Sequence, residues 1–253
     1  DLGIATDIDT IEFEANKLGS LKLIKDGDNL VISFDGQTGK VTVQNQFGTD
    51  KTSRIEMLKF GENLLNITSF ILGTAGNDTI NGTIDDDTIL GDLGHDVIFG
   101  GTGNDTIDGG EGDDVIYGED GNDTMKGSAD NDIIFGGNGD DKLTGNEGND
   151  LLTGGFGNDT FVVTKPGDID TITDFTAGQD KLDLTQYNQF SSLKTLQYFS
   201  DGFTQNGANT TMKIDGETSV VLQNQTTAVM LQNQNFIFDI KASTKATDGN
   251  DIL

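Results

Sequence analysis

The sequence predicts an all-β fold built around a flattened solenoid of 18-residue coils. Three observations predict it: a nine-residue repeat that runs without a gap from residue 73 to 162, a content of 35 glycines in 253 residues, and 43 acidic against 15 basic residues. A fixed period of this kind is typical of repeat proteins, in which each unit buries its apolar face against its neighbours. The formal net charge of −28 must be offset if such coils are to stack.

Ten nonapeptides make up the repeat. The first position is Gly in all ten, the sixth is Asp in all ten, and the eighth is always apolar, from Ile80 to Phe161. The fourth position is Gly except at Asp85 and Asp130, and Gly, Asn and Asp are the residues that tolerate a left-handed backbone. We therefore interpret the first six residues of each repeat as a turn and the last three as a short strand whose eighth residue points inward.

The sixth-position aspartates are predicted to stack on one another in every second repeat. Two nine-residue units return the chain to the same side, and neighbouring coils lie one strand spacing apart, about 4.8 Å. Two carboxylates at about 5 Å repel by roughly 3 kcal/mol at an effective dielectric of 20. Residues 73–162 hold 21 acidic residues and two lysines, Lys126 and Lys142. The array therefore needs cations between its coils.

The residue types present select the kind of cation. The chain has no cysteine and one histidine, which excludes thiolate sites and imidazole-based sites. Oxygen ligands remain, and they suit a hard cation such as Ca²⁺. Glycine-rich turns offer many carbonyl oxygens, which favours Ca²⁺ over Mg²⁺, and no EF-hand spacing of acidic residues occurs.

The nonapeptides GGTGNDTID and GGEGDDVIY resemble the GGxGxDxUx repeats, with U large and apolar, of the RTX (repeats-in-toxin) family of haemolysin-type calcium-binding proteins. The resemblance implies a parallel β-roll with Ca²⁺ between successive coils, about eight ions here, held by sixth-position carboxylates and by carbonyls of the turns. The implied carboxylate ligands are Asp78, Asp87, Asp96, Asp105, Asp114, Asp123, Asp132, Asp141, Asp150 and Asp159. The turn glycines are Gly76, Gly94, Gly103, Gly112, Gly121, Gly139, Gly148 and Gly157.

Residues 163–240 are predicted to form a β-rich cap. The stretch 161–184 continues the nine-residue register for one more turn and places Asp168 over Asp150, as a further candidate ligand. Segment 209–238 resembles the cap of secreted RTX proteins. It alternates in TMKI and SVVLQ around Asp215-Gly216, which indicates a hairpin. A solenoid needs such a cap, because its last coil would otherwise expose an open edge.

Residues 1–72 are predicted to form a β-rich flanking block. Segment 21–47 reads as a three-stranded meander with turns at Asp26-Gly27 and Asp35-Gly36, and RIEMLKF (54–60) as a fourth strand. The block is similar to haemolysin-type calcium-binding-related segments found between RTX arrays. Residues 241–253 are predicted to be a linker in which ATDGNDIL starts the next array, so we expect the chain to be a segment of a longer protein.

Catalysis is not expected from this chain. It has no HExxH, no G-x-S-x-G and no cysteine nucleophile. His95 occupies the outward fifth position of a turn and is expected to be a surface residue. Without metal the array is expected to be disordered, because only one residue in nine points inward and its charges repel.

Three functions stay open from the sequence. The leading one is a calcium-binding module that folds on binding calcium after type I secretion, within a larger bacterial toxin or adhesin. The alternative is the non-catalytic C-terminal roll of a secreted protease, lipase or epimerase, and the third is direct binding of a sugar or surface.

The expected partners are calcium ions and the type I secretion machinery. Nucleic acid is disfavoured by the net charge of −28 and membrane insertion by the lack of long apolar runs. We expect a monomeric segment, secreted or on the bacterial cell surface, with no Sec-type signal at residues 1–10.

Overall fold

The computed structural model describes residues 10–13, 21–26, 29–34, 40–43, 57–60, 63–66, 70–164, 168–187, 203–214, 218–230 and 235–237. In these ranges the regular secondary structure is almost entirely strand, with one four-residue helix, α2 (Thr227–Met230). The predicted all-β class is therefore confirmed. No helix among these residues has the length and apolar character needed to cross a membrane.

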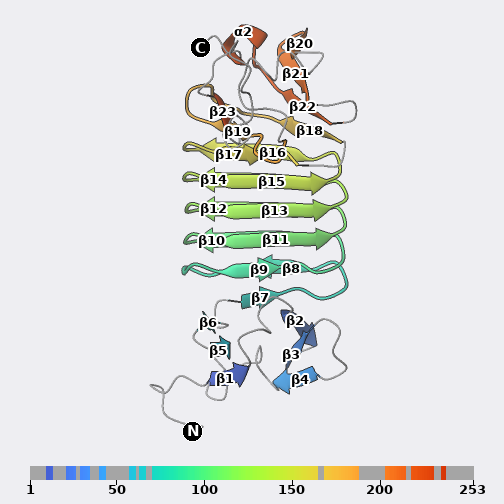
Figure 1. Cartoon of the computed structure of the whole chain (residues 1–253), viewed down its shortest axis with the longest axis vertical. Helices are drawn as coiled ribbons and strands as arrows, with labels where there is room; N and C mark the ends of the chain where they lie inside the picture. Colours follow the sequence, from blue (N-terminus) through green and yellow to red (C-terminus); the bar gives the residue numbers. More distant parts are fainter. Residues whose placement is uncertain are drawn as a thin grey trace, which may run out of the picture.

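The centre of the molecule is a solenoid made of two parallel sheets (Figure 1). One sheet stacks β8 (Thr79–Asn81), β10 (Val97–Thr102), β12 (Val115–Asp120), β14 (Ile133–Asn138) and β16 (Leu151–Phe156). The other stacks β7 (Phe70–Leu72), β9 (Thr88–Leu90), β11 (Thr106–Glu111), β13 (Thr124–Ala129), β15 (Lys142–Glu147) and β17 (Thr160–Val162). Equivalent residues 18 apart are paired, for example Ile98 with Ile116. This confirms the predicted 18-residue coil.

The strands of the central coils are longer than predicted. They cover the last three positions of one repeat and the first three of the next, so the turn holds only the fourth to sixth positions. The predicted six-residue turn is therefore wrong, because the first-position glycine belongs to the strand. This glycine is buried in strand conformation, and an added Cβ on Gly109 would lie 2.8 Å from the Gly127 carbonyl oxygen of the next coil. Glycine is needed there for close coil packing.

In the solenoid the eighth-position side chains point inward, as predicted, and form a continuous core. Ile98, Ile116 and Ile134 are fully buried, and the core continues through Leu152 into Phe161. Each such side chain contributes roughly 1.5–3 kcal/mol through burial. On the outer face of the first sheet, Phe99, Tyr117 and Phe135 stack with ring centroids 5.0 Å apart. The aromatic rings thus follow the same coil-to-coil register as the core.

The C-terminal cap continues both sheets of the solenoid. β18 (Ile169–Ile172) and β19 (Lys181–Asp183) add a coil, and β22 (Ser219–Leu222) and β23 (Phe236–Ile237) lie on them in parallel. β20 (Phe203–Asn206) and β21 (Asn209–Lys213) then close the first sheet in antiparallel fashion. The pairing of β21 with β22 confirms the predicted hairpin strands. Residues 215–217, at its turn, lie outside the described residues.

The N-terminal block contains two small sheets. β2 (Leu21–Asp26), β3 (Asn29–Phe34) and β4 (Lys40–Val43) form the predicted antiparallel meander. β5 (Met57–Phe60) confirms the strand predicted at 54–60, and it pairs with β1 (Thr10–Phe13) and β6 (Asn63–Asn66) in a separate sheet. The predicted linker at 241–253 lies outside the described residues.

Candidate metal centre

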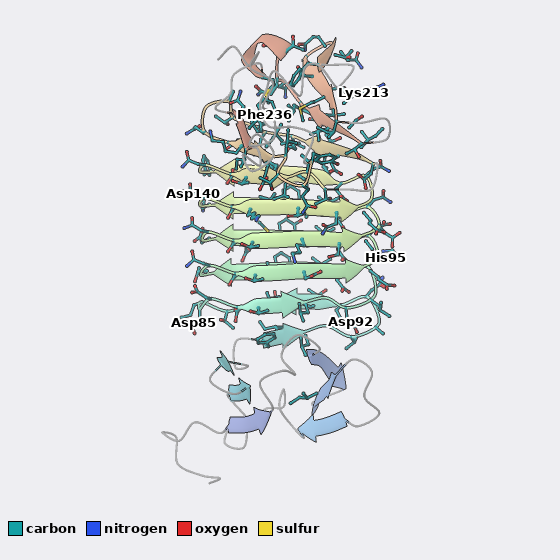
Figure 2. The ribbon with its side chains drawn as sticks, viewed as in Figure 1. Asp85, Asp92, His95, Asp140, Lys213 and Phe236 are labelled. Carbon is teal, nitrogen blue, oxygen red and sulfur yellow. The ribbon has the colours of Figure 1, made fainter. Side chains whose placement is uncertain are left out.

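The sixth-position aspartates form a hydrogen-bonded ladder from coil to coil. They belong to the turns, which line the two edges of the roll (Figure 2). The backbone N–H of Asp105 donates to Oδ1 of Asp123 at 2.7 Å, one coil further along. The same bond, at 2.7–3.0 Å, joins all eight predicted pairs: 78/96, 87/105, 96/114, 105/123, 114/132, 123/141, 132/150 and 141/159. The structure therefore brings together the carboxylates that the sequence paired. Their role as ligands stays a prediction.

The second carboxylate oxygen of these residues is buried without a partner. Among the described residues, seven Oδ2 atoms make no hydrogen bond: those of Asp96, Asp105, Asp114, Asp123, Asp132, Asp141 and Asp150. Each of these residues is at most 2% exposed. A buried carboxylate oxygen without a donor costs several kcal/mol unless a cation or proton satisfies it. This row of free oxygens fits a divalent cation between the coils.

Main-chain oxygens lie close to the free carboxylate oxygens. A Cβ added to Gly118 would lie 2.5 Å from both Oδ2 of Asp123 and the carbonyl oxygen of Gly136, and one added to Gly100 would lie 2.6 Å from Oδ2 of Asp105 and from the Gly118 carbonyl oxygen. The first-position glycine thus leaves open a space faced by a carboxylate and a carbonyl.

Carboxylates alone do not complete a site. No three His, Cys, Asp or Glu side chains of the described ranges converge on one point that could hold a metal. Calcium takes six to eight oxygen ligands, so carbonyls must supply most of them. The fourth-position residues are suited to this, since Gly94, Gly103 and Gly112 have φ values of 130°, 122° and 117° that turn the backbone out of strand conformation. Asp130 at the same position also has a positive φ, 75°, as its residue type predicts.

Burial disfavours the charged form of these carboxylates in the metal-free roll. Desolvation is the largest cause and raises the pKa of Asp132 to about 8, that of Asp141 to about 7, and that of Asp123 to about 6. Backbone hydrogen bonds lower each pKa, and the stacked neighbouring aspartate raises it again. At neutral pH the closed roll therefore needs either protons or metal cations.

Acid is expected to restore structure to the metal-free chain. The pKa of Asp132 rises from 3.8 to about 8 in the closed roll, so protonation stabilises the roll fully below about pH 4, and this stabilisation is lost as the pH rises to about 8. In excess chelator, the β-sheet signal in far-UV circular dichroism should decline over that range. With calcium present it should persist at pH 8, where the carboxylates are free to bind metal. A chelator-treated chain whose spectrum is the same at pH 4 and pH 8 would contradict this.

The structure corrects the position of the last stacked aspartate. Asp170, not Asp168, accepts the N–H of Asp150 on its Oδ1 at 3.2 Å, because two extra residues shift the register to 20. Asp168 instead accepts the N–H of Gly148 at 2.9 Å, and its role as a ligand stays a prediction. Asp180 accepts the N–H of Asp159 at 3.0 Å, across a spacing of 21 residues. A strict period of nine does not identify Asp170 or Asp180, because their spacings from the preceding aspartates are 20 and 21 residues.

The fifth-position side chains form a second ladder that runs in the opposite direction. Nδ1 of His95 accepts the N–H of Asp113 at 2.8 Å, and Oδ1 of Asp113 accepts the N–H of Asn131 at 2.9 Å. His95 is exposed, as predicted (Figure 2). Asn and Asp serve equally well here because only one acceptor oxygen is used. This ladder stabilises the turns without burying charge.

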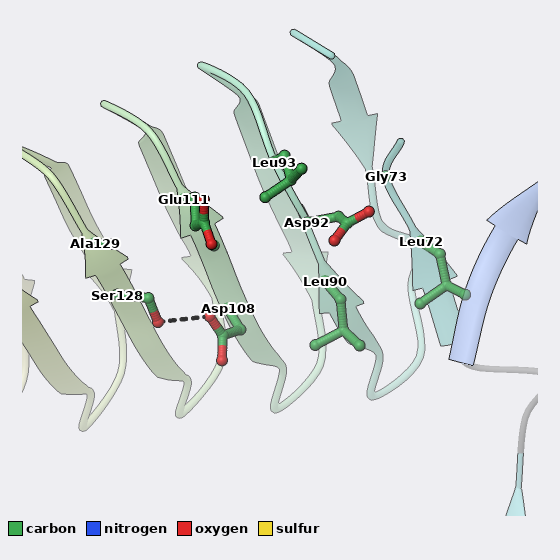
Figure 3. A pocket seen from close by; sticks show the side chains of 10 residues that line it. Leu72, Gly73, Leu90, Asp92, Leu93, Asp108, Glu111, Ser128 and Ala129 are labelled. Carbon is green, nitrogen blue, oxygen red and sulfur yellow. Dashed lines mark hydrogen bonds between the residues drawn. The ribbon is translucent and has the colours of Figure 1, made fainter. Parts of the chain in front are cut away.

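A groove lies on the outer face of the second sheet, near its N-terminal end (Figure 3). Leu72, Leu90 and Leu93 line it together with the acidic side chains Asp92, Asp108 and Glu111. Oγ of Ser128 donates to Oδ1 of Asp108 at 2.7 Å. Asp108 and Glu111 both come from β11 and Asp92 from the coil before it, and none of the three belongs to the buried ladder. The groove therefore presents apolar surface beside negative charge.

Comparison with known families identifies the repeats. The model of the RTX calcium-binding nonapeptide repeat matches four times, at residues 70–98, 91–125, 99–134 and 126–161. The model of the haemolysin-type calcium binding protein related domain matches residues 29–61. Such nonapeptide repeats bind calcium, which agrees with the oxygen-rich edges described above. No curated protein sequence matches the chain.

Comparison with solved structures also found matches. They include the extracellular lipase LipA of Serratia marcescens, with 18% identity, a TM-score of 0.31 and coverage of 66% of this chain and 39% of the lipase. The AlgE6R2 subunit of the Azotobacter vinelandii mannuronan C5-epimerase matches with 25% identity and a TM-score of 0.33, over 66% of this chain and 91% of the subunit. The AlgE6R3 subunit matches with 21% identity and a TM-score of 0.31, over 72% and 87%.

Proposed function

The chain belongs to the RTX family, and on that premise we propose that it is a calcium-triggered folding module of a larger bacterial toxin or adhesin that is exported by a type I system. The module has no catalytic role of its own. Its partners are calcium ions, up to eight with one for each stacked aspartate pair, and the secretion machinery. It acts outside the cell or on the bacterial surface as a monomeric segment of its parent chain.

The row of buried Oδ2 atoms without partners carries this proposal. Seven carboxylates, from Asp96 to Asp150, are closed into the roll with one oxygen unsatisfied. Bound calcium supplies positive charge and open coordination positions at these oxygens. The sixth-position carboxylates, with nearby carbonyls, would hold the ions. Without them the chain repels itself, because residues 73–162 carry 21 acidic residues and only two lysines.

Charge then links export to folding. In a cytosol poor in calcium, the repulsive array stays unfolded and is able to pass through a narrow channel. Outside the cell, calcium at about millimolar concentration falls in the range in which extracellular calcium modules bind, and it shifts the equilibrium toward the roll. Binding of an acidic glycan is not favoured, since the groove of Figure 3 is lined by Asp92, Asp108 and Glu111.

A calcium titration followed by circular dichroism tests the proposal. We expect the transition from unfolded to β-rich chain to be half complete between about 10⁻⁴ and 10⁻³ M calcium at neutral pH, the range of extracellular modules. Magnesium at the same concentrations should not replace calcium. A midpoint below about 10⁻⁶ M, where cytosolic sensor and buffer sites bind, would mean that the chain folds before export and would contradict the proposal.

A further inference from the structure

The first coil of the roll satisfies its aspartates in a different way from the others. Oδ2 of Asp78 accepts the N–H of Thr74 at 2.6 Å and the hydroxyl of Thr74 at 2.8 Å. Oδ2 of Asp87 accepts the same two groups of Thr83, at 2.7 and 2.8 Å. Asp87 is 4% exposed and thus as deeply placed as the later aspartates, yet its Oδ2 has two donors where theirs have none.

The backbone of these two turns also differs. The second position of the repeat has a positive φ in every later repeat, for example 79° at Asp92, 108° at Gly101 and 74° at Glu119. Thr74 and Thr83 are not among the described residues with positive φ. A β-branched threonine strongly disfavours that conformation, so its N–H stays directed at the aspartate four residues ahead.

The backbone at the fourth position also differs between the first two repeats and the later ones. Gly76 and Asp85 lack the positive φ that every later fourth-position residue has, from Gly94 to Gly157. A Cβ added to Gly76 would meet nothing within 4 Å, whereas one added to Gly94 would lie 2.7 Å from the backbone carbon of Gly76. The first turn on each edge therefore has a different course from the turn that stacks on it.

The carboxylate itself is displaced as a result. In the later repeats Oδ2 lies over the first-position glycine, 2.6 Å from a Cβ added to Gly91 or Gly100. The three atoms nearest to such a Cβ on Gly73 or Gly82 include no oxygen of Asp78 or Asp87. In the later coils a carboxylate and a carbonyl face the space above the first-position glycine. In the first coil the carboxylate is not among the nearest atoms to that space.

From these contacts we propose that Thr74 and Thr83 replace calcium in the first coil, so that only the six pairs from 96/114 to 141/159 form two-carboxylate calcium sites. This inference rests on the proposed function, since it assigns which turns take the metal. Both donors of each threonine occupy the oxygen that would face the ion. Thr74 and Thr83 act as positioning residues that satisfy the carboxylates of Asp78 and Asp87 by hydrogen bonds, without metal.

The other end of the roll is closed in a similar way. The N–H of Thr176 donates to Oδ2 of Asp180 at 2.5 Å, again across four residues, while Oδ1 of Asp180 accepts the N–H of Asp159. The segments TAGND (74–78), TIDDD (83–87) and TAGQD (176–180) share the T-x-x-x-D spacing. In the repeats between, the residue four before the aspartate is Gly, Asp, Glu, Ser or Asn. Threonine at this position therefore marks the metal-independent ends of the array.

Calcium bound per chain, measured by equilibrium dialysis at saturating calcium, tests the inference. The double variant Asp78→Asn/Asp87→Asn should bind as many ions as the wild type, because an asparagine oxygen still accepts from the threonine. The matched variant Asp105→Asn/Asp114→Asn should bind fewer ions. A loss of two ions from the first variant would overturn the inference while leaving the proposed function intact. Absence of bound calcium in the wild type would overturn the proposed function as well.

A second pair of variants tests the threonines directly. Thr74→Gly/Thr83→Gly removes the hydroxyls and permits a positive φ, so it should gain two ions relative to the wild type. Asn146→Gly makes the same kind of change in a turn that is already open, with φ of 76°, and should leave the number unchanged. An unchanged number in the threonine variant, with the roll folded by circular dichroism, would overturn the role given to the threonines.

Discussion

Replacing Asp123 by asparagine is expected to raise the calcium concentration needed for folding by about tenfold or more, equivalent to at least about 1.4 kcal/mol. Asp123 belongs to two pairs, 105/123 and 123/141, so one substitution alters two sites. Asparagine keeps an oxygen for the N–H of Asp105 but puts an amide donor where Oδ2 now lies buried without a partner. A donor at that place repels a cation. The midpoint of a calcium titration measures the effect.

Asp113→Asn is the matched control for this variant. It removes the same charge from a neighbouring edge position, but Asp113 is exposed and uses one oxygen to accept the N–H of Asn131 at 2.9 Å. Asparagine accepts the equivalent N–H at the fifth position of five repeats, at Asn77, Asn104, Asn122, Asn131 and Asn149. We expect its midpoint to stay within about twofold of the wild type, a change of no more than roughly 0.4 kcal/mol. Equal shifts in the two variants would mean that total charge, and not ligation, determines the midpoint.

Replacing Gly121 by alanine is expected to prevent the central coils from closing. The residue has a φ of 146°, which only glycine adopts readily, and its Cβ would overlap the carbonyl oxygen of Gly103 in the preceding coil. Both coils would have to separate, breaking ladder bonds on either side. We expect a loss of at least about 3 kcal/mol in the free energy of unfolding at saturating calcium, measured by urea titration.

Gly76→Ala is the control for Gly121→Ala at the same position of the repeat. Gly76 has no positive φ, and an added Cβ would have nothing within 4 Å. We expect a change of no more than about 0.5 kcal/mol, as for other substitutions without new contacts. If the two alanines proved equally harmful, the difference between the first turn and the later turns would have to be abandoned.

The period of the sequence was enough to predict which residues stack. Because two nonapeptides make one coil, Asp105 had to meet Asp123, and the structure places the two in hydrogen-bond contact. The inward column from Ile80 to Phe161 followed from the same period. The strand length did not follow, because glycine in a sequence signals a turn as readily as close packing between strands. Only the buried position of Gly109 between coils distinguishes these roles.

Other features depend on contacts that the repeat does not encode. Two extra residues before Asp170 shift the register, so a strict period selected Asp168. The closure of Asp78 by Thr74 depends on a backbone angle that the threonine determines. The pairing of β5 with β1 joins segments more than 40 residues apart, and local alternation carries no information about such a partner.

Small-angle X-ray scattering at neutral pH, with and without calcium, tests the central claim most directly. That claim is that buried carboxylate oxygens, from Asp96 to Asp150, hold the roll closed only when calcium satisfies them. In excess EGTA we expect the radius of gyration to rise toward about 55 Å, the value for an unfolded chain of this length, and to fall again on addition of calcium. A scattering curve that is the same in EGTA and in calcium would contradict the account.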